Sequence, residues 1–496
     1  MSLKKLRITV AVVVITLITL LFLDFTGMAQ EWFGWLAKVQ FLPALLAMHI
    51  GVVAGLIILT LLFGRLYCSV ICPLGIMQDI FGWLGKKQKR YRYGYSPAVR
   101  WLRYSMLVIM VILMVAGFGG VAALIAPYSS FGRIVQNLLS PVWAWCNNLL
   151  AGWAAEHDSY MFYDTEIWIR NWSVFGVAVA TVVILAVLAW RNGRTYCNTI
   201  CPVGTVLGFF SRFSFLAPVI DTSKCNSCGL CARNCKAACI NSKVHQIDYS
   251  RCVTCFDCLD SCHKGAISYG RRKKEVAVVP VTDGASVDKS RRSFLTVTGM
   301  VTAAAMVKAA DKTVDGGLAV IEDKKIPERS NRIVPPGAKG IKHLSNHCTA
   351  CQLCVAACPN GVLRPSTAID SFMQPYSSYE RGYCRPECTR CSDVCPAGAI
   401  KPVSVEEKSS IQIGHACWVK ENCIPLTDGV ECGNCARHCP TGAIQMVPSD
   451  ASDPDSVKIP VVNTEKCIGC GACENLCPAR PFSAIYVEGH VNHRII

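Results

Sequence analysis

The sequence predicts an α-helical membrane domain joined to small α+β domains that are rich in cysteine. Hydrophobic residues make up 52% of the 496-residue chain, and its mean hydropathy of +0.34 is too high for an ordinary soluble protein. The chain also holds 31 cysteines, too many for structural disulfides at this length. Its net charge of +16 comes largely from basic residues beside apolar runs, which indicates orientation in a membrane and not nucleic acid binding.

Four apolar runs are predicted to be transmembrane helices, at residues 8–25, 41–63, 104–126 and 174–190. A cleaved secretory signal is the alternative for the first run, but further spans follow it. Lysines and arginines gather before the first span and between the second and third, whereas the other two connections are poor in positive charge. By the positive-inside rule, the N-terminus and the residues after the fourth span are therefore cytoplasmic.

The long connection between the third and fourth spans contains apolar residues at helical spacing from Val135 to Trp153. This pattern fits a helix that lies in the outer membrane interface. A helix packed over the bundle explains the pattern equally well.

A short motif occurs twice in the membrane domain. The sequence GRLYCSVICPLG spans residues 64–75, and GRTYCNTICPVG spans residues 193–204. Each copy follows an outward-and-return pair of predicted helices. The repeat therefore predicts two parallel halves related by an axis along the membrane normal.

Residues 225–262 contain two runs with the spacing C-x2-C-x2-C-x3-C, which is typical of [4Fe–4S] ligands. The fourth cysteine of such a run commonly binds the neighbouring cluster, so we expect Cys235 and Cys262 to be exchanged. Zinc is the alternative for any single pair of cysteines, but this spacing recurs too often along the chain for it. The first run consists of Cys225, Cys228, Cys231 and Cys235, and the second of Cys252, Cys255, Cys258 and Cys262.

The segment from Ser290 to Leu295 has the sequence SRRSFL and precedes a short, weakly apolar run. This composition is that of a twin-arginine export signal, which carries folded proteins across the membrane. A chance Arg-Arg pair before a buried helix is the alternative. The export signal predicts that the residues after it lie in the periplasm.

Four cysteine sets after residue 346 predict a polyferredoxin with four more [4Fe–4S] clusters. One set is irregular, because either Cys417 or Cys423 could complete it. We favour Cys423, whose shorter loop closes directly on the cluster. The regular sets are Cys348, Cys351, Cys354 and Cys358; Cys384, Cys388, Cys391 and Cys395; and Cys467, Cys470, Cys473 and Cys477; the irregular set is Cys423, Cys432, Cys435 and Cys439.

The repeated motifs of the membrane domain add four thiols: Cys68, Cys72, Cys197 and Cys201. A pseudo-twofold axis could bring them together, and they are enough for one further cluster. Redox-active dithiols and reduced structural cysteines are the alternatives.

Three residues are candidates for a quinone site. His49 is the only histidine in the four predicted spans, and an ionisable group inside a membrane is a functional candidate. A histidine packed near the outer interface is the alternative. Tyr128 and Arg133, at the outer end of the third span, are weaker candidates of the same kind.

The predicted fold is therefore an α-helical membrane bundle of four transmembrane helices in two parallel repeats, with α+β ferredoxin-like domains on both sides of the membrane. A fifth segment serves as export signal or anchor. The predicted domains are the bundle at 1–215, a two-cluster ferredoxin at 216–275, the twin-arginine segment at 286–310, a linker at 311–343 and the polyferredoxin at 344–496.

These motifs resemble a known pair of families. Residues 1–270 resemble NapH, the membrane quinol dehydrogenase component of periplasmic nitrate reductase systems, through the four spans, the two G-R-x-Y-C-x3-C-P-x-G motifs and the two-cluster ferredoxin. Residues 290–496 resemble its partner NapG, a twin-arginine-exported ferredoxin with four clusters. The chain looks like a fusion of the two.

The resemblance implies a bacterial inner-membrane, multi-pass electron-transfer component. It would oxidise quinol from the membrane quinone pool and pass electrons through six or more [4Fe–4S] clusters to a periplasmic reductase or cytochrome. One alternative is a conduit from a cytoplasmic, low-potential donor of the ferredoxin type. Another is an accessory factor that reduces a metal during assembly of a different enzyme.

Overall fold

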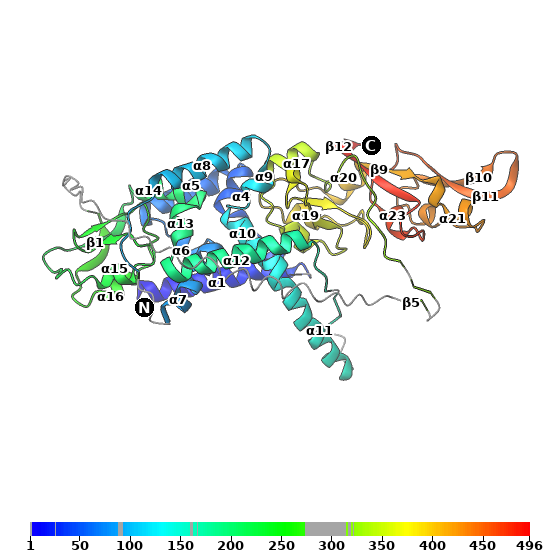
Figure 1. The fold of residues 1–496 in the computed structure, drawn as a ribbon. Coiled ribbons are helices and arrows are strands. Elements are labelled where there is room, and N and C mark those ends of the chain that lie inside the picture. The colour runs from blue at the N-terminus through cyan, green and yellow to red at the C-terminus, as the bar shows by residue number, and fades with distance from the viewer. Residues whose placement is uncertain are drawn as a thin grey trace, which may run out of the picture.

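The computed structural model describes residues 2–24, 26–87, 93–158, 162–165, 167–272, 314–315, 319–320 and 322–496. The chain is elongated, with a helical bundle in the middle and a ferredoxin-like domain at each end (Figure 1). We call residues 216–272 the first ferredoxin domain and residues 322–496 the second. The predicted twin-arginine segment, 286–310, lies outside the described residues.

The bundle contains long helices and several short ones that turn back within it. Its elements are α1 (Leu3–Leu23), α2 (Met28–Phe33), α3 (Trp35–Lys38), α4 (Phe41–Leu46), α5 (Ile50–Phe63), α6 (Tyr67–Val70), α7 (Pro73–Lys87), α8 (Arg100–Val115), α9 (Gly119–Ala122), α10 (Pro127–Ile134), a π-helical turn (Val135–Leu139), α11 (Ser140–Glu156), α12 (Trp172–Asn192), α13 (Thr195–Thr199) and α14 (Pro202–Ser211). Within the described residues, α1 and α12 are the two helices long and apolar enough to cross a membrane.

The second and third predicted spans are not continuous helices, and this corrects the prediction. Instead of one helix over 41–63, α4 ends at Ala47 because Met48 adopts a left-handed conformation (φ 58°). The amide of His49 then donates to the carbonyl of Ala44 (2.9 Å) and that of Met48 to Leu45 (3.2 Å). These two bonds form a Schellman motif, which closes a helix C-terminus.

The same device interrupts the predicted span 104–126. Gly117 has a φ of 85°, and the amide of Phe118 donates to the carbonyl of Leu113 (2.8 Å). Helix α8 therefore ends, and the chain continues through α9 into α10, which Pro127 opens. Gly117 was the visible sequence signal for this stop, since glycine adopts the left-handed conformation without steric cost.

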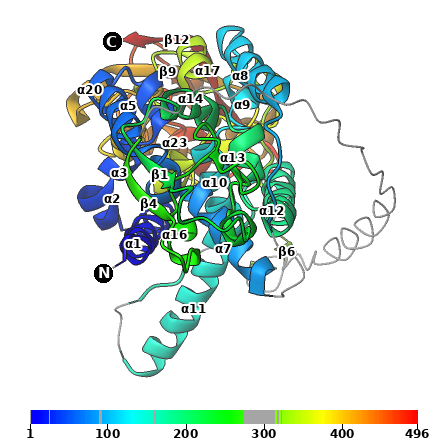
Figure 2. The ribbon, with the colours of Figure 1, turned by 90° about the vertical axis from the view of Figure 1, so that its left-hand side faces the viewer.

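The predicted helix at Val135–Trp153 forms as the π-helical turn and α11. Helix α11 projects away from the rest of the bundle (Figure 1, Figure 2). Its apolar side chains are exposed, including Trp143, Trp145 and Trp153. This geometry favours the helix in a membrane interface over the helix packed on the bundle, because exposed tryptophans are typical of such interfaces.

The two copies of the repeated motif are held together by crossed arginines. Arg65 of the first copy donates to the carbonyl of Cys197 in the second (3.1 Å). In return, Arg194 of the second copy donates to the carbonyl of Cys68 in the first. The glycine that ends each motif leaves room for this crossing, because a Cβ on Gly204 would lie 2.7 Å from Arg65 Nη2.

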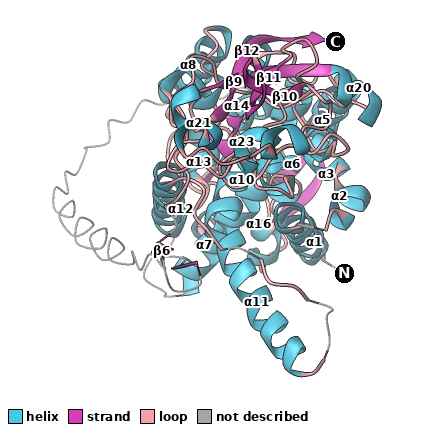
Figure 3. Cartoon of the chain, turned by 90° about the vertical axis from the view of Figure 1, so that its right-hand side faces the viewer, coloured by secondary structure: helices cyan, strands magenta, loops and turns pink. Residues whose placement is uncertain are grey.

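Each ferredoxin domain is built from short helices and two-stranded antiparallel sheets. In the second domain, the longest sheets lie toward the end of the molecule that is farthest from the first domain, which faces the viewer in Figure 3. The first domain contains β1 (Leu216–Ile220), α15 (Leu230–Asn234), β2 (Ile240–Asn241), β3 (Gln246–Ile247), α16 (Asp257–Ser261) and β4 (Ile267–Arg271), with β1 paired to β4 and β2 to β3.

The second domain contains α17 (Ile341–His347), α18 (Leu353–Ala357), β7 (Leu363–Pro365), a 3-10 turn (Ile369–Ser371), β8 (Pro375–Ser377), α19 (Arg390–Asp393), α20 (Val405–Ser410), β9 (Ile411–Trp418), a 3-10 turn (Lys420–Asn422), α21 (Ile424–Thr427), α22 (Asn434–Arg437), β10 (Ile444–Asp450), β11 (Asp453–Val462), α23 (Ala472–Leu476) and β12 (Ile485–Ile495). Strand β7 pairs with β8, β9 with β12 and β10 with β11. A small hairpin, β5 (Val314–Asp315) with β6 (Ala319–Val320), precedes the domain.

Both ferredoxin domains dock closely on the bundle. On the first domain, Thr254 Oγ1 donates to the carbonyl of Phe63 (3.1 Å), and the carbonyl of Lys236 accepts from the amide of Arg194 (2.7 Å). On the second, Asn137 Nδ2 donates to Gln352 Oε1 (2.9 Å), and Asn171 Nδ2 donates to the carbonyl of Pro365 (3.3 Å). One apolar core runs through the bundle and into both domains.

We predict that Gly204→Ala lowers the free energy of unfolding by about 1–3 kcal/mol, because its Cβ would be forced against packed atoms. The new atom would lie 2.3 Å from the carbonyl oxygen of Cys197. Gly176→Ala, in α12, is the matched control because a Cβ there meets nothing within 4 Å. Thermal unfolding of the detergent-purified variants measures the difference, and equal stability of the two variants would contradict the crossed packing.

Candidate iron–sulfur sites

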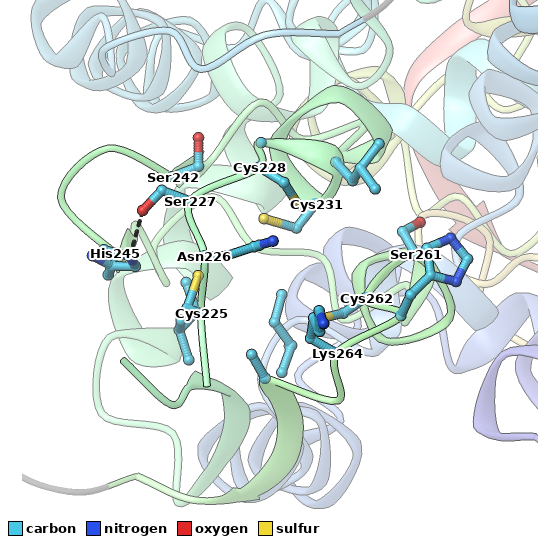
Figure 4. A pocket seen from close by; sticks show the side chains of 16 residues that line it. Cys225, Asn226, Ser227, Cys228, Cys231, Ser242, His245, Ser261, Cys262 and Lys264 are labelled. Atoms are coloured by element: carbon cyan, nitrogen blue, oxygen red, sulfur yellow. Dashed lines mark hydrogen bonds between the residues drawn. The ribbon is translucent and has the colours of Figure 1, made fainter. Parts of the chain in front are cut away.

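The first cysteine set lies at the outer end of the first ferredoxin domain. Cys225, Cys228, Cys231 and Cys262 line one cavity of about 190 Å³ (Figure 4). Cys262 therefore belongs with the first three cysteines of the other run, which is the arrangement that the expected exchange requires. Cys228 is exposed, so this set lies close to the protein surface.

The second set lies between the first and the bundle. Cys235, Cys252, Cys255 and Cys258 line one small cavity together with Cys239. Cys239 was not predicted to take part, yet its Sγ lies 3.5 Å from that of Cys235. A fifth buried thiol beside four ligands can donate a hydrogen bond to their sulfur atoms. Such hydrogen bonds are one way in which a protein adjusts the reduction potential of a cluster.

The backbone before each short helix explains why the cysteines converge. In the four runs with the spacing C-x2-C-x2-C-x3-C, the helix that carries the third cysteine begins directly after a residue in the left-handed conformation. At two of these positions the residue is not glycine: Phe256 has a φ of 63° and Gln352 a φ of 65°. This turn bends the chain around the site, so that the first three thiols face one point.

The four thiols of the repeated motifs gather in the middle of the bundle, and we call them the bundle tetrad. Cys68, Cys72, Cys197 and Cys201 are each 4% exposed. The four sulfur atoms lie close to one another. The crossing of the two motif copies therefore brings together the residues that the sequence separates by more than a hundred positions.

The surroundings of the bundle tetrad suit an anionic group. Arg65 is fully buried, and its side chain contacts Asn198 Oδ1 (2.9 Å), two backbone carbonyls and Cys68 Sγ (3.8 Å), none of them a carboxylate. A buried cation without a counter-charge is costly. Thiolates that hold a cluster supply such a charge, so the residues present fit a [4Fe–4S] group.

Hydrogen bonds also reach three of these sulfur atoms. Gln78 Nε2 donates to Cys197 Sγ (3.2 Å), and the amide of Gly204 donates to Cys201 Sγ (3.3 Å). Arg65 Nη2 reaches Cys68. Such donors stabilise thiolates and raise the reduction potential of a bound cluster.

The second ferredoxin domain holds four sets, arranged as two exchanged pairs. One cavity is lined by Cys358, Cys384, Cys388 and Cys391, and another by Cys423, Cys432, Cys435 and Cys477. In the remaining two sets, sulfur atoms of different motifs lie near one another: Cys395 near Cys348, Cys351 and Cys354, and Cys439 near Cys467 and Cys470, beside Cys473. In both pairs, the last cysteine of each run lies at the neighbouring site.

The geometry separates the two alternatives for the irregular set. Cys423 is buried and lines the cavity with Cys432 and Cys435. Cys417 lies on β9 opposite Tyr486 of β12 and does not line that cavity. Cys423, and not Cys417, therefore lies where a fourth ligand of this set is required.

Burial raises the pKa of several thiols in these sets. It raises the pKa of Cys470 to about 12, and that of Cys435 to about 11, with neighbouring thiols adding to the effect. Protons would therefore remain on the sulfur atoms of Cys470 and Cys435 at neutral pH without a cation. Iron supplies the positive charge that holds such ligands as thiolates. In the described residues, no group of three or more histidine, cysteine or acidic side chains closes on a single metal ion.

Contacts join the cysteine sets from the first domain, through the bundle, to the second domain. The first domain meets the bundle tetrad at Arg65, which also donates to the carbonyl of Ser250 (3.1 Å), next to the Cys252 run. The second domain meets the bundle at Gly132, which closely approaches the carbonyl of Cys351. Within the second domain, the amide of Cys384 donates to the carbonyl of Cys470 (2.9 Å) and so joins the two pairs.

The three predicted quinone-site residues lie in different places. His49 lies in the exposed break between α4 and α5 and not within a helix, which corrects its expected position. Tyr128 and Arg133 are buried in α10, between the bundle tetrad and the second domain. Arg133 donates to the carbonyl of Ala123 (3.0 Å) and to Ser130 Oγ (3.1 Å), and the neighbouring Gly132 closely approaches Cys351.

An ion-paired cluster at the other end of the bundle was not predicted. Asp79 accepts from Arg194 Nε (2.7 Å), Arg7 Nη1 (2.8 Å) and Lys236 Nζ (2.9 Å), and so ties α1, α7 and α13 to the first domain. Burial lowers the pKa of Lys236, but Asp79 and Asp257 outweigh it, so the pKa is raised and the lysine stays charged. The sequence signal was a lone aspartate on an apolar helix.

Three family models match parts of the chain. A "4Fe-4S binding domain" model matches residues 45–91 and again 174–219, so it covers both copies of the repeated motif. Two "4Fe-4S dicluster domain" models match residues 248–362 and 430–480. The chain therefore contains several domains of the [4Fe–4S] cluster-binding kind. No solved structure matches the chain.

Relatives among known proteins include NapH of Haemophilus influenzae, which is 24% identical over 45% of this chain and 68% of its own length. NapF of Escherichia coli, a ferredoxin-type protein, is 29% identical over 32% of this chain and 89% of its own length. YccM of Escherichia coli is 26% identical over 45% of this chain. The chain spans 55% of YccM and 24% of another relative, the regulatory protein NosR of Stutzerimonas stutzeri.

The expected resemblance to NapH is thus confirmed, and the chain is an iron–sulfur protein related to NapH, NapF, YccM and NosR. The two long apolar helices and the similarity to NapH indicate association with a membrane.

We predict that Cys423→Ser removes about four iron atoms per chain, because one cluster loses a ligand. Cys417→Ser is the matched control and should leave the iron content unchanged, since this thiol lies outside the cavity. Iron analysis of protein purified without oxygen measures both. Loss of iron from Cys417→Ser alone would reverse the assignment.

Proposed function

We propose that this chain is a membrane-bound electron conduit that oxidises quinol and delivers electrons to a redox partner at the far end of the second ferredoxin domain. The observation that carries the proposal is that cysteine sets lie in the first domain, in the bundle and in the second domain, with contacts that join each part to the next. The names of NapF, a ferredoxin-type protein, and of YccM, an electron transport protein, agree with it.

The proposed ligands are the 24 ferredoxin cysteines in their exchanged sets, with Cys423 in the irregular one, and the bundle tetrad as a seventh site. When bound, [4Fe–4S] clusters supply one-electron carriers. The chain itself fixes their positions and the charge around them. Buried Arg65 and Arg133 both lie beside cysteine sets and contact no carboxylate among their hydrogen-bond partners.

The bundle tetrad favours a cluster over the dithiol and structural alternatives. A reactive dithiol needs access to a partner, but all four thiols are buried. Neutral structural thiols would leave Arg65 without a counter-charge. A cluster accounts for the burial and for the arginine together.

The proposed orientation places the first domain in the cytoplasm and the second in the periplasm. Basic residues gather at the end of the bundle that meets the first domain, as the positive-inside rule requires. The exposed tryptophans of α11 would then lie in the outer membrane interface. The acceptor would be a periplasmic reductase or cytochrome, docking near the Cys423 set.

One observation favours a second candidate function, a conduit from a soluble low-potential donor. The cavity of the first cysteine set opens at the protein surface, and Cys228 in it is exposed. A ferredoxin-type donor could therefore deliver electrons there, on the side opposite to the proposed exit.

An anaerobic titration distinguishes the two directions. We predict that a menaquinol analogue added to the detergent-purified protein produces the EPR signals of reduced clusters, because each quinol releases two electrons and two protons. Reduction by dithionite or a low-potential ferredoxin, with no signal from quinol, would contradict quinol oxidation and favour entry at the first set.

A second experiment addresses the bundle tetrad. We predict that Cys72→Ser lowers the iron content by about four atoms per chain. Cys146→Ser is the control, because this exposed cysteine of α11 belongs to none of the sets. Unchanged iron in the Cys72 variant would remove the seventh cluster from the proposal.

A further inference from the structure

A cavity of about 490 Å³ lies between α1, α7 and the first ferredoxin domain. One end is apolar and includes Ile8, Val12, Ile80 and Trp83. These four side chains are between 40% and 61% exposed, so this end opens on the surface that would face lipid. The lining also includes the buried polar side chains of Arg7, Gln78 and Arg194, and we call the part of the cavity beside them its enclosed end.

Buried polar atoms at the enclosed end lack partners. Gln78 is 1% exposed, and its Oε1 has no hydrogen bond within the described residues. The same is true of Arg7 Nε and Arg194 Nη2, which belong to side chains that line the cavity. Burying such atoms without partners costs free energy. Gln78 Oε1 could accept a hydrogen bond from a bound molecule, and Arg7 Nε and Arg194 Nη2 could donate to it.

The enclosed end also touches the bundle tetrad. Gln78 lines the cavity with its side chain while its Nε2 donates to Cys197 Sγ (3.2 Å). A molecule that forms a hydrogen bond with Gln78 in the cavity would therefore be separated from Cys197, a proposed cluster ligand, by the Gln78 side chain alone.

The two halves of the repeat differ at this point. A shift of 129 residues, from 64 to 193, places Leu207 and Gly208 where the first half has Gln78 and Asp79. In the second half Leu207 is fully buried, and the guanidinium of Arg103 occupies the space beside Gly208. Among the residues that the structure describes, the first half and not the second thus combines an apolar opening with unpaired polar atoms, as a ligand site requires.

We propose that this cavity binds the quinol of the proposed function, on which the inference rests. The ring hydroxyl groups would lie at Gln78, Arg7 and Arg194, with one donating to Gln78 Oε1 and one accepting from a guanidinium. The isoprenoid tail would leave past Ile80 and Trp83 into the bilayer. An acyl lipid also has an apolar tail, but it gives no reason for a contact between the cavity and Cys197.

The test uses the whole detergent-purified protein and heptyl-hydroxyquinoline N-oxide, a quinol analogue whose fluorescence is quenched on binding. Ile80→Trp fills the opening, and Gln78→Leu removes the unpaired acceptor. Ile58→Trp is the matched control, because Ile58 is also an exposed isoleucine but lies on α5 and does not line the cavity. Iron content and unfolding temperature verify that each variant is folded.

We expect Ile80→Trp and Gln78→Leu to bind the analogue about tenfold more weakly than the wild-type chain, and Ile58→Trp to bind it equally well. If the Gln78→Leu variant loses iron, the Ile80→Trp variant alone tests the proposed quinol site, because the Ile80 side chain lies at the surface.

Wild-type affinity in Ile80→Trp, with quinol still reducing the clusters, would overturn the site but leave the proposed function intact. Unchanged analogue binding with loss of a co-purified anionic phospholipid would assign the cavity to lipid instead. No binding to the wild-type chain, together with no reduction by quinol, would overturn both.

Discussion

Two crossed arginines hold the centre of this molecule together. Arg65 and Arg194 each leave their own copy of the repeated motif and donate to a cysteine carbonyl of the other. The crossing closes the bundle, brings the four motif thiols together and places a positive charge beside them. It also reaches outward, because Arg65 bonds to the first ferredoxin domain at Ser250 and Arg194 to the ion-paired Asp79.

The cysteine chemistry could be predicted from the sequence because ligand spacing is a local property. Cys225 to Cys231 lie within one turn of chain and one short helix, so their convergence needs no knowledge of the fold. The choice of Cys423 over Cys417 also followed from loop length, and Cys423 lines the cavity with Cys432 and Cys435. The exchange between the Cys358 and Cys395 runs could not be derived, because it depends on how two motifs about 30 residues apart pack.

The bundle was predicted less well, and the reasons are physical. Apolar composition indicates burial in lipid or protein but does not show where a helix stops. A left-handed residue at Met48 carries no sequence signal, whereas the one at Gly117 does. The short helices that turn back within the bundle are tolerated because hydrogen bonds close their ends, as at His49 and Phe118. The polar pair Gln78 and Asp79 corresponds to Leu207 and Gly208 in the second half, a difference that only a comparison of the two halves reveals.

The central claim is that the bundle tetrad carries a cluster that joins the two ferredoxin domains. The most direct measurement is a cryo-electron microscopy map of the chain, purified and frozen without oxygen. The account predicts strong density for a cluster bounded by Cys68, Cys72, Cys197 and Cys201, in line with six others in the exchanged sets. A map with six clusters, and with disulfides or unligated thiols at the tetrad, would contradict it.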